Sequence, residues 1–141
     1  MNKGIGILFC SRNEETPQQG MEHINGGNEE LYWSTIGFSI KKDNFIFPII
    51  GLIHVKGKNV MYKCSIIDIK PYDISHHTDP SKKPPSWIEE QRNHPENNYR
   101  STLVVTTMDR FSYNTRNLDG IDGKTIINPP RGYQRIILPQ D

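Results

Sequence analysis

Two tryptophans stand where polar stretches of the chain meet expected regular elements. Trp33 follows Tyr32 and precedes the hydroxyl side chains of Ser34 and Thr35, while Trp87 follows a proline-rich stretch. Indole rings stack on nucleobases, and hydroxyl groups can hydrogen-bond a base edge. Two facing indoles would hold a base turned out of a strand or duplex, with Ser34 and Thr35 reading its edge. The alternative interpretation is that both indoles fill the core.

Motifs of the common enzyme classes do not occur in the sequence. It has no phosphate loop, no Gly-x-Gly-x-x-Gly after a strand, no His-Glu-x-x-His and no Gly-x-Ser-x-Gly. His76 and His77 are adjacent but lack a nearby third ligand for zinc. Cys10 and Cys64 are expected to be buried free thiols of a cytoplasmic protein. We therefore expect no catalysis, no metal and no cofactor.

Length and composition indicate one domain built from short elements. The chain has 141 residues, of which 34% are hydrophobic, with 10 Pro and 11 Gly. We expect a single domain over residues 1–141, which is compatible with the N-terminal part of a longer protein. No apolar run approaches the roughly 18 residues of a membrane span. A formal net charge of +1 excludes a polybasic nucleic-acid binder, although a modest basic face remains compatible with it.

The centre of the chain has the pattern of a β-hairpin. The run Phe45–Val55 is almost continuously apolar, a turn follows at Lys56–Asn59, and Val60–Lys70 alternates in part. A first arm buried on both faces and a second arm buried on one are predicted. Pro48 and Gly51 argue against a helix, and Pro48 is expected at a bulge or an edge.

The remaining segments predict further strands around this hairpin. We expect strands at residues 4–10, 99–108 and 131–139, with a short one at 125–127, and a helix at 84–92 with Ser86 as its N-cap. Residues 11–30 have few apolar side chains and are predicted to form a long loop. Asp119-Gly120 and Asp122-Gly123 are turn signals. The resulting fold class is α+β, a small mixed and mainly antiparallel barrel of five or six strands with one or two short helices.

The residues Tyr32-Trp33-Ser34-Thr35, the apolar strand from Phe45 and the later loop bearing Trp87 resemble the YTH and EVE domains. These are PUA-like barrels that hold a modified base in an aromatic cage. The resemblance implies that Trp33 and Trp87 are the cage walls and that Ser34 bonds the base edge. It also implies an Asn from the loop before Trp33, for which Asn25 and Asn28 are the candidates.

The size and the proline in the last strand also resemble the N-terminal reader domains of McrB-type prokaryotic restriction systems, which recognise methylated DNA ahead of a GTP-dependent motor and a nuclease subunit. The expected function is capture of a flipped N6-methyladenine or 5-methylcytosine. Candidates for holding phosphates are Lys41, Lys42, Lys82, Lys83, Arg92 and Arg110. RNA is the alternative ligand. A domain of another class, for protein interaction or of a small hydrolase-like kind, is the alternative if both tryptophans are core.

Overall fold

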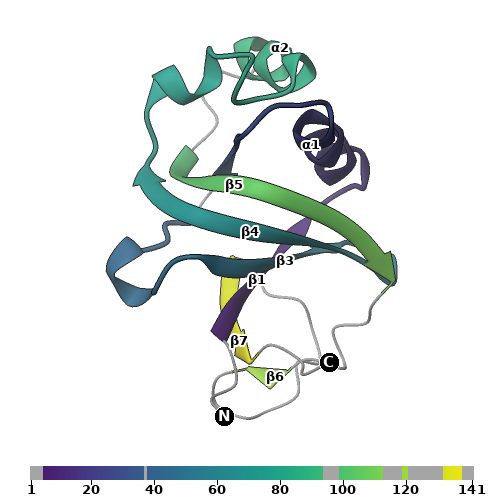
Figure 1. The fold of residues 1–141 in the computed structure, drawn as a ribbon, viewed down its shortest axis with the longest axis vertical. Coiled ribbons are helices and arrows are strands. Elements are labelled where there is room, and N and C mark those ends of the chain that lie inside the picture. The colour runs from purple at the N-terminus through teal and green to yellow at the C-terminus, as the bar shows by residue number, and fades with distance from the viewer. Residues whose placement is uncertain (1–4, 37, 94–98, 113–118, 121–131, 138–141) are drawn as a thin grey trace.

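The computed structural model describes residues 5–36, 38–93, 99–112, 119–120 and 132–137 and shows a mixed α+β fold (Figure 1). One seven-stranded, mostly antiparallel sheet has the order β2-β5-β4-β3-β1-β7-β6. Its strands are β1 (Ile5–Ser11), β2 (Leu31–Ile36), β3 (Ile49–Val55), β4 (Val60–Pro71), β5 (Tyr99–Ser112), β6 (Asp119–Gly120) and β7 (Tyr133–Ile137). The α+β class is confirmed.

The central hairpin is confirmed as β3 and β4, with pairs that run from His54 opposite Met61 to Ile49 opposite Ile66. β3 is largely buried on both faces and β4 alternates, as the sequence patterns predict. The first arm is shorter than expected, because β3 begins only at Ile49, directly after the cis Phe47–Pro48 bond. Ile46, which the apolar run assigned to the strand, is 93% exposed.

The sheet curls so that its distant strands approach each other. Four strands separate β2 from β7 in the sheet order, yet the Phe38 ring after β2 stacks on Tyr133 of β7 with centroids 5.9 Å apart. β1 runs parallel to β3, and the other strand pairs are antiparallel. Among the described strand pairs, β2 and β7 share no hydrogen-bonded ladder, so the contact between them is made by side chains.

The predicted loop over residues 11–30 is wrong, because this stretch contains the 11-residue helix α1 (Glu15–Asn25). The face that α1 buries consists of Pro17, Gly20 and His23, with Met21 and Ile24 partly buried against the core. Because the most buried positions are small or polar, the helix does not show a clear apolar stripe. It is stabilised by packing on β2 and β5 rather than by its own sequence pattern.

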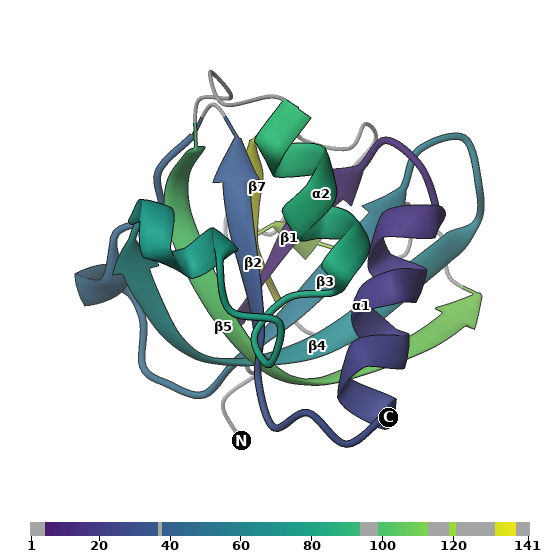
Figure 2. The same cartoon turned by 90° about the horizontal axis from the view of Figure 1, so that it is seen from above.

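Helix α2 (Pro85–Asn93) confirms the predicted helix but not its cap. It begins at Pro85, a position that tolerates the missing N–H, so Ser86 lies inside the first turn and its hydroxyl donates to Gln19 Oε1 at 3.1 Å. Two 3-10 turns, η1 (Lys42–Asn44) and η2 (Ile74–His77), occupy expected turn and loop segments. Figure 2 shows α1 and α2 on the same side of the molecule.

Near the C-terminus, the turn signal Asp119-Gly120 forms the two-residue strand β6 instead, paired with β7. The sheet therefore exceeds the five or six strands expected. The possible strand at 125–127 and the signal Asp122-Gly123 lie outside the described residues. The last strand is confirmed as β7, in which Ile136 is fully buried while Tyr133 packs against the larger core cluster.

The core has a large cluster under the helices and a small one on the opposite face of the sheet. Cys64 is buried in the large cluster, whereas Cys10 is only partly buried, and neither forms a disulfide. Within the described part of the chain, none of the helices has the length and apolar character needed to cross a membrane.

Candidate nucleic-acid interface

The two tryptophans lie together, but their rings do not face each other. The Trp33 and Trp87 centroids are 5.4 Å apart with the ring planes at 89°, and Phe9 meets Trp33 edge-on on another side at 5.8 Å. Edge-to-face contact is a favourable packing arrangement for aromatic rings. Because the rings touch at a right angle, no base-sized gap separates them in this conformation. The facing geometry expected from the sequence is therefore not the one observed.

Helix α1 holds the Trp87 ring in place. Gln19 Oε1 accepts a 3.0 Å hydrogen bond from Trp87 Nε1, and Trp87 is only 8% exposed. A methyl group at Gly20 would stand 3.2 Å from Trp87 Cη2 and 2.9 Å from Leu31 Cδ2. The glycine therefore permits close approach of α1 to the aromatic pair, which explains a helix-weakening residue at this position.

The segment that carries Trp87 is docked on the free edge of β2. The backbone N–H of Tyr32 donates to the Lys82 carbonyl at 2.7 Å. Asp79 shapes the preceding turn, since its Oδ1 accepts from the Ser81 N–H at 2.9 Å. Because β2 is the last strand on this side of the sheet, its outer edge is open to such pairing. The docked segment brings Lys83 and Trp87 to the side of Ser34.

Lys83 is buried without a carboxylate partner among the described residues. Its exposure is 3%, and its ammonium donates a single long hydrogen bond, to Ser34 Oγ at 3.4 Å. The Trp87 and Tyr99 rings each lie 6.0 Å from Nζ, at the limit of a cation–π contact. Burial lowers the pKa of Lys83 from 10.5 to about 7. A buried, weakly compensated lysine marks Lys83 as a candidate functional residue.

A hydrogen-bond chain of fixed direction continues from Lys83. The backbone N–H of Asp73 donates to His76 Nδ1 at 3.3 Å, so Nδ1 is an acceptor and the imidazole proton is on Nε2. Thr102 Oγ1 must then donate to Nδ1, at 2.7 Å, and accept from Ser34 Oγ, at 3.2 Å. Because the Ser34 proton is used in this way, one of the two lone pairs of its oxygen accepts from Lys83. The chain therefore ends in donor groups on Lys83.

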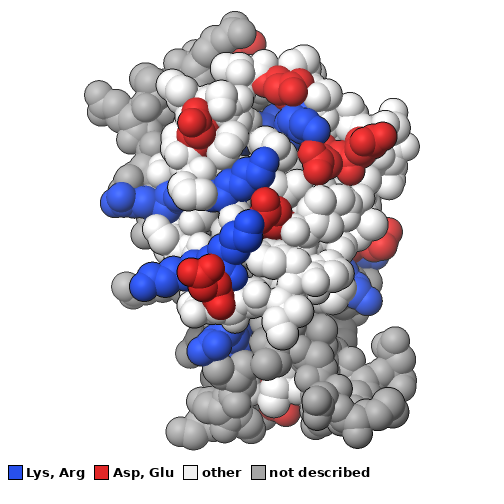
Figure 3. Space-filling view, turned by 60° about the vertical axis from the view of Figure 1, so that its left-hand side comes forward, with Lys and Arg blue, Asp and Glu red and all other residues white. Residues whose placement is uncertain are grey.

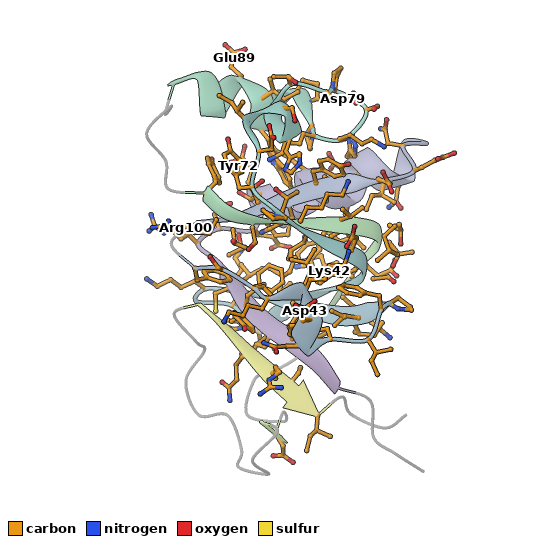
Figure 4. The ribbon with its side chains drawn as sticks, turned by 90° about the vertical axis from the view of Figure 1, so that its left-hand side faces the viewer. Lys42, Asp43, Tyr72, Asp79, Glu89 and Arg100 are labelled. Carbon is orange, nitrogen blue, oxygen red and sulfur yellow. The ribbon has the colours of Figure 1, made fainter. Side chains whose placement is uncertain are left out.

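Tyrosines and lysines adjoin this chain on the same end of the sheet. Lys70 and Lys82 lie 5.2 and 5.8 Å from the centroid of the Tyr32 ring, and Lys70 Nζ donates to the Tyr32 hydroxyl at 3.2 Å. Tyr72 stacks on Tyr99 with centroids 5.2 Å apart. Figure 4 shows Tyr72 below α2 and above both Arg100 and Lys42. This end of the molecule combines aromatic faces with positive charge.

Two of the predicted base-binding residues, Thr35 and Asn28, have structural roles in this conformation. The buried Thr35 hydroxyl donates to the Phe38 carbonyl at 2.7 Å and accepts from the Ser101 N–H at 3.1 Å. The Asn28 amide donates to the His23 carbonyl at 2.8 Å and so closes the end of α1. Asn25 is exposed at the last position of that helix. That one of these asparagines reads a base edge stays a prediction.

The predicted phosphate ligands do not form one group. Lys42, Lys82 and Arg110 are each paired with a carboxylate, of Asp68, Glu30 and Glu14 respectively, while Lys41 is exposed and Lys83 is buried. The Arg92 side chain lies outside the described residues. Arg110 and Thr102 are eight positions apart on β5, which corresponds to roughly 26 Å. Figure 3 shows basic side chains on one face with carboxylates set among them.

Residues of the site that the sequence analysis did not assign to it include Lys70, Tyr99, Thr102 and Gln19. Thr102 and Tyr99 were assigned only to a strand, and Lys70 only to the end of the hairpin. The alternation of β4 and β5 could have placed Lys70 and Thr102 opposite each other, since they are paired in the observed register.

No cluster of three or more potential metal ligands occurs within the described ranges. Comparison with protein-family models, with curated proteins and with solved structures finds no match for this chain.

Proposed function

We propose that this chain is a nucleic-acid-binding reader that takes up one unstacked, modified base at the free edge of β2. The observation that carries the proposal is the position of Lys83, buried between Trp87 and Tyr99 and bonded to Ser34. Aromatic faces supply stacking, and hydroxyl and ammonium groups supply contacts to a base edge.

Base entry requires movement of the segment 79–87 in this proposal. Trp87 contacts Trp33 edge to face, so its ring must turn or withdraw before a planar group can lie against Trp33. The segment is held on β2 by the Tyr32 to Lys82 backbone bond and on α1 by Gln19. The Lys82–Glu30 ion pair and the bond between His23 Nε2 and the Ser81 carbonyl also hold the segment, and Trp87 is buried in the core, so opening costs free energy that the contacts with the base must offset.

In this proposal the domain is a PUA-like barrel whose preferred ligand is DNA that carries N6-methyladenine or 5-methylcytosine. Its binding directs a restriction complex with a GTP-dependent motor to that DNA. The curled sheet and the contact between Phe38 and Tyr133 support a barrel-like closure. Lys70 and Lys82 beside Tyr32 support a nearby phosphate path. Because the path has few cations, affinity is expected to fall only modestly with salt, by a log–log slope of about −0.9 per phosphate contacted.

The test is binding to three labelled DNA duplexes that are unmodified or carry N6-methyladenine or 5-methylcytosine, at one moderate salt concentration. We expect preference for one modified duplex, and loss of that preference in Ser34→Ala. The exposed Ser39 offers the matched control, Ser39→Ala, which should bind as the wild type does. Equal or absent binding to all three duplexes would refute the proposal for methylated DNA. RNA of the same sequence, tested in competition, then decides for or against an RNA reader, since only RNA presents the 2′-hydroxyl.

A protein-interaction domain with both tryptophans in the core is the second candidate. The observation in its favour is that Trp87 belongs to the main core cluster and that Trp33 packs against it. In that case both indoles emit at short wavelength and resist iodide quenching, and Trp33→Phe leaves every nucleic-acid affinity unchanged. If iodide quenches the fluorescence of either indole, and added DNA protects that indole from quenching, this candidate is contradicted.

A further inference from the structure

Lys83 differs from its neighbour in a way that points to a role in ligand selection. Lys82 is paired with Glu30 at 2.7 Å, whereas Lys83 donates only a 3.4 Å bond to a hydroxyl. An ammonium group has three donors. Among the described contacts, one of these three N–H groups makes a long hydrogen bond, and the others are near the Trp87 and Tyr99 rings.

The hydrogen-bond chain determines which ligand groups fit beside Lys83. Asp73, His76 and Thr102 orient the Ser34 hydroxyl proton away from Lys83, as described above. A ligand group that reaches this point therefore meets ammonium donors and a serine oxygen whose proton is already used. An acceptor, such as a base carbonyl oxygen or an unprotonated ring nitrogen, satisfies the ammonium, whereas a donor in the same place leaves the ammonium without a partner.

We propose that Lys83 is the specificity-determining donor of the site, which selects a base edge that presents an acceptor and takes up a proton as the base binds. This inference rests on the proposed function. In the free protein, desolvation disfavours the charged amine, and an acceptor placed against Nζ restores the charged form. Binding and protonation of Lys83 therefore favour each other.

The pKa of Lys83 in the free protein, about 7, sets the pH range in which the coupling is visible. Above pH 7 the free lysine loses its proton while the bound one keeps it, so affinity should fall as the pH rises, with a slope that approaches about tenfold per pH unit well above pH 7. Burial lowers the pKa of His76, which places its own titration below this range. Other groups facing the site are Asp73 of the η2 cap, Lys70 of β4, Tyr99 of β5 and Lys82.

The experiment is titration of the tightest-binding of the three DNA duplexes from pH 6.5 to 8.5 at constant salt. The wild type should lose about 15-fold in affinity between pH 7 and 8.5, and calorimetry in two buffers of different ionisation enthalpy should show uptake of about 0.9 proton at pH 8. Lys83→Met should bind more weakly at pH 7 and show no such slope. Lys83→Arg, which stays charged, should also lose the slope, and Lys82→Met should keep it.

The outcomes separate the two proposals. Binding without pH dependence, or a slope that persists in Lys83→Met, would overturn the role of Lys83 and leave the reader function standing. Absence of binding to DNA and to RNA at every pH would overturn the reader function, and the role of Lys83 with it.

Discussion

Replacing Lys83 by Met is expected to stabilise the protein. Burial lowers the pKa of Lys83 from 10.5 to about 7, and each pKa unit corresponds to about 1.4 kcal/mol. Burying the charged form therefore costs roughly 4 kcal/mol at pH 7. Loss of the long bond to Ser34 offsets about 1 kcal/mol of the gain. We expect the free energy of unfolding to rise by about 2–4 kcal/mol in Lys83→Met at pH 7.

The pH dependence of this gain has a definite sign. Between pH 7 and 10.5 the unfolded chain binds more protons at Lys83 than the folded protein does, so this residue makes stability rise with pH. The free-energy cost of burying the Lys83 ammonium is fully present below pH 7 and absent above pH 10.5. The stability difference between Lys83→Met and the wild type should therefore shrink by about 2 kcal/mol from pH 7 to pH 9.

Urea denaturation of both proteins at pH 7, 8 and 9, followed by circular dichroism, measures this difference. Subtraction of the two curves cancels the contributions of the other titrating groups. Lys82→Met is the matched control, because its lysine is paired with Glu30 and partly exposed, and its stability should change by about 1 kcal/mol or less. A less stable Lys83→Met, or a difference that does not vary with pH, would refute the view that Lys83 is a buried and uncompensated charge.

Two further substitutions test how α1 is anchored. Glu14→Gln should lower the free energy of unfolding by about 1–2 kcal/mol, because Glu14 is bonded to Arg110 and its pKa is lowered to about 2. The extra stability of the wild type should be present above pH 4.5 and lost as the pH falls towards 2, which acid titration of both proteins measures. Gly20→Ala should cost about 1–3 kcal/mol and shift the Trp87 emission, because its methyl group would contact Leu31 and Trp87; unchanged stability and fluorescence would contradict this packing.

Local sequence patterns were sufficient to predict the hairpin, β1, β5 and β7, whereas β2 and β6 were not predicted as strands. β3 and β4 follow from apolar runs around a polar turn, and β5 follows from β-branched residues, because strand formation depends strongly on alternation and side-chain shape. Helix α1 was missed because its buried positions include Pro17, Gly20 and His23. Those residues suit the face of α1 only once β2 and Trp87 lie against it.

The candidate site depended on tertiary structure to a larger degree. The residue types at Trp33, Ser34 and Trp87 suggested an aromatic site from the sequence, and the fold does bring them together. Their relative orientation is decided by the docking of the segment 79–87 on β2 and by Gln19 of α1. Ring planes depend on contacts between segments far apart in the chain, which residue spacing does not encode.

The consecutive lysines show this division most clearly. The sequence determined that two cations follow one another after a turn, and both were assigned to phosphates. Tertiary structure decided that Lys82 reaches Glu30 while Lys83 is enclosed by Trp87 and Tyr99. The physical reason is that a lysine's pKa and partners are set by its surroundings, and those surroundings come from α2, β2 and β5.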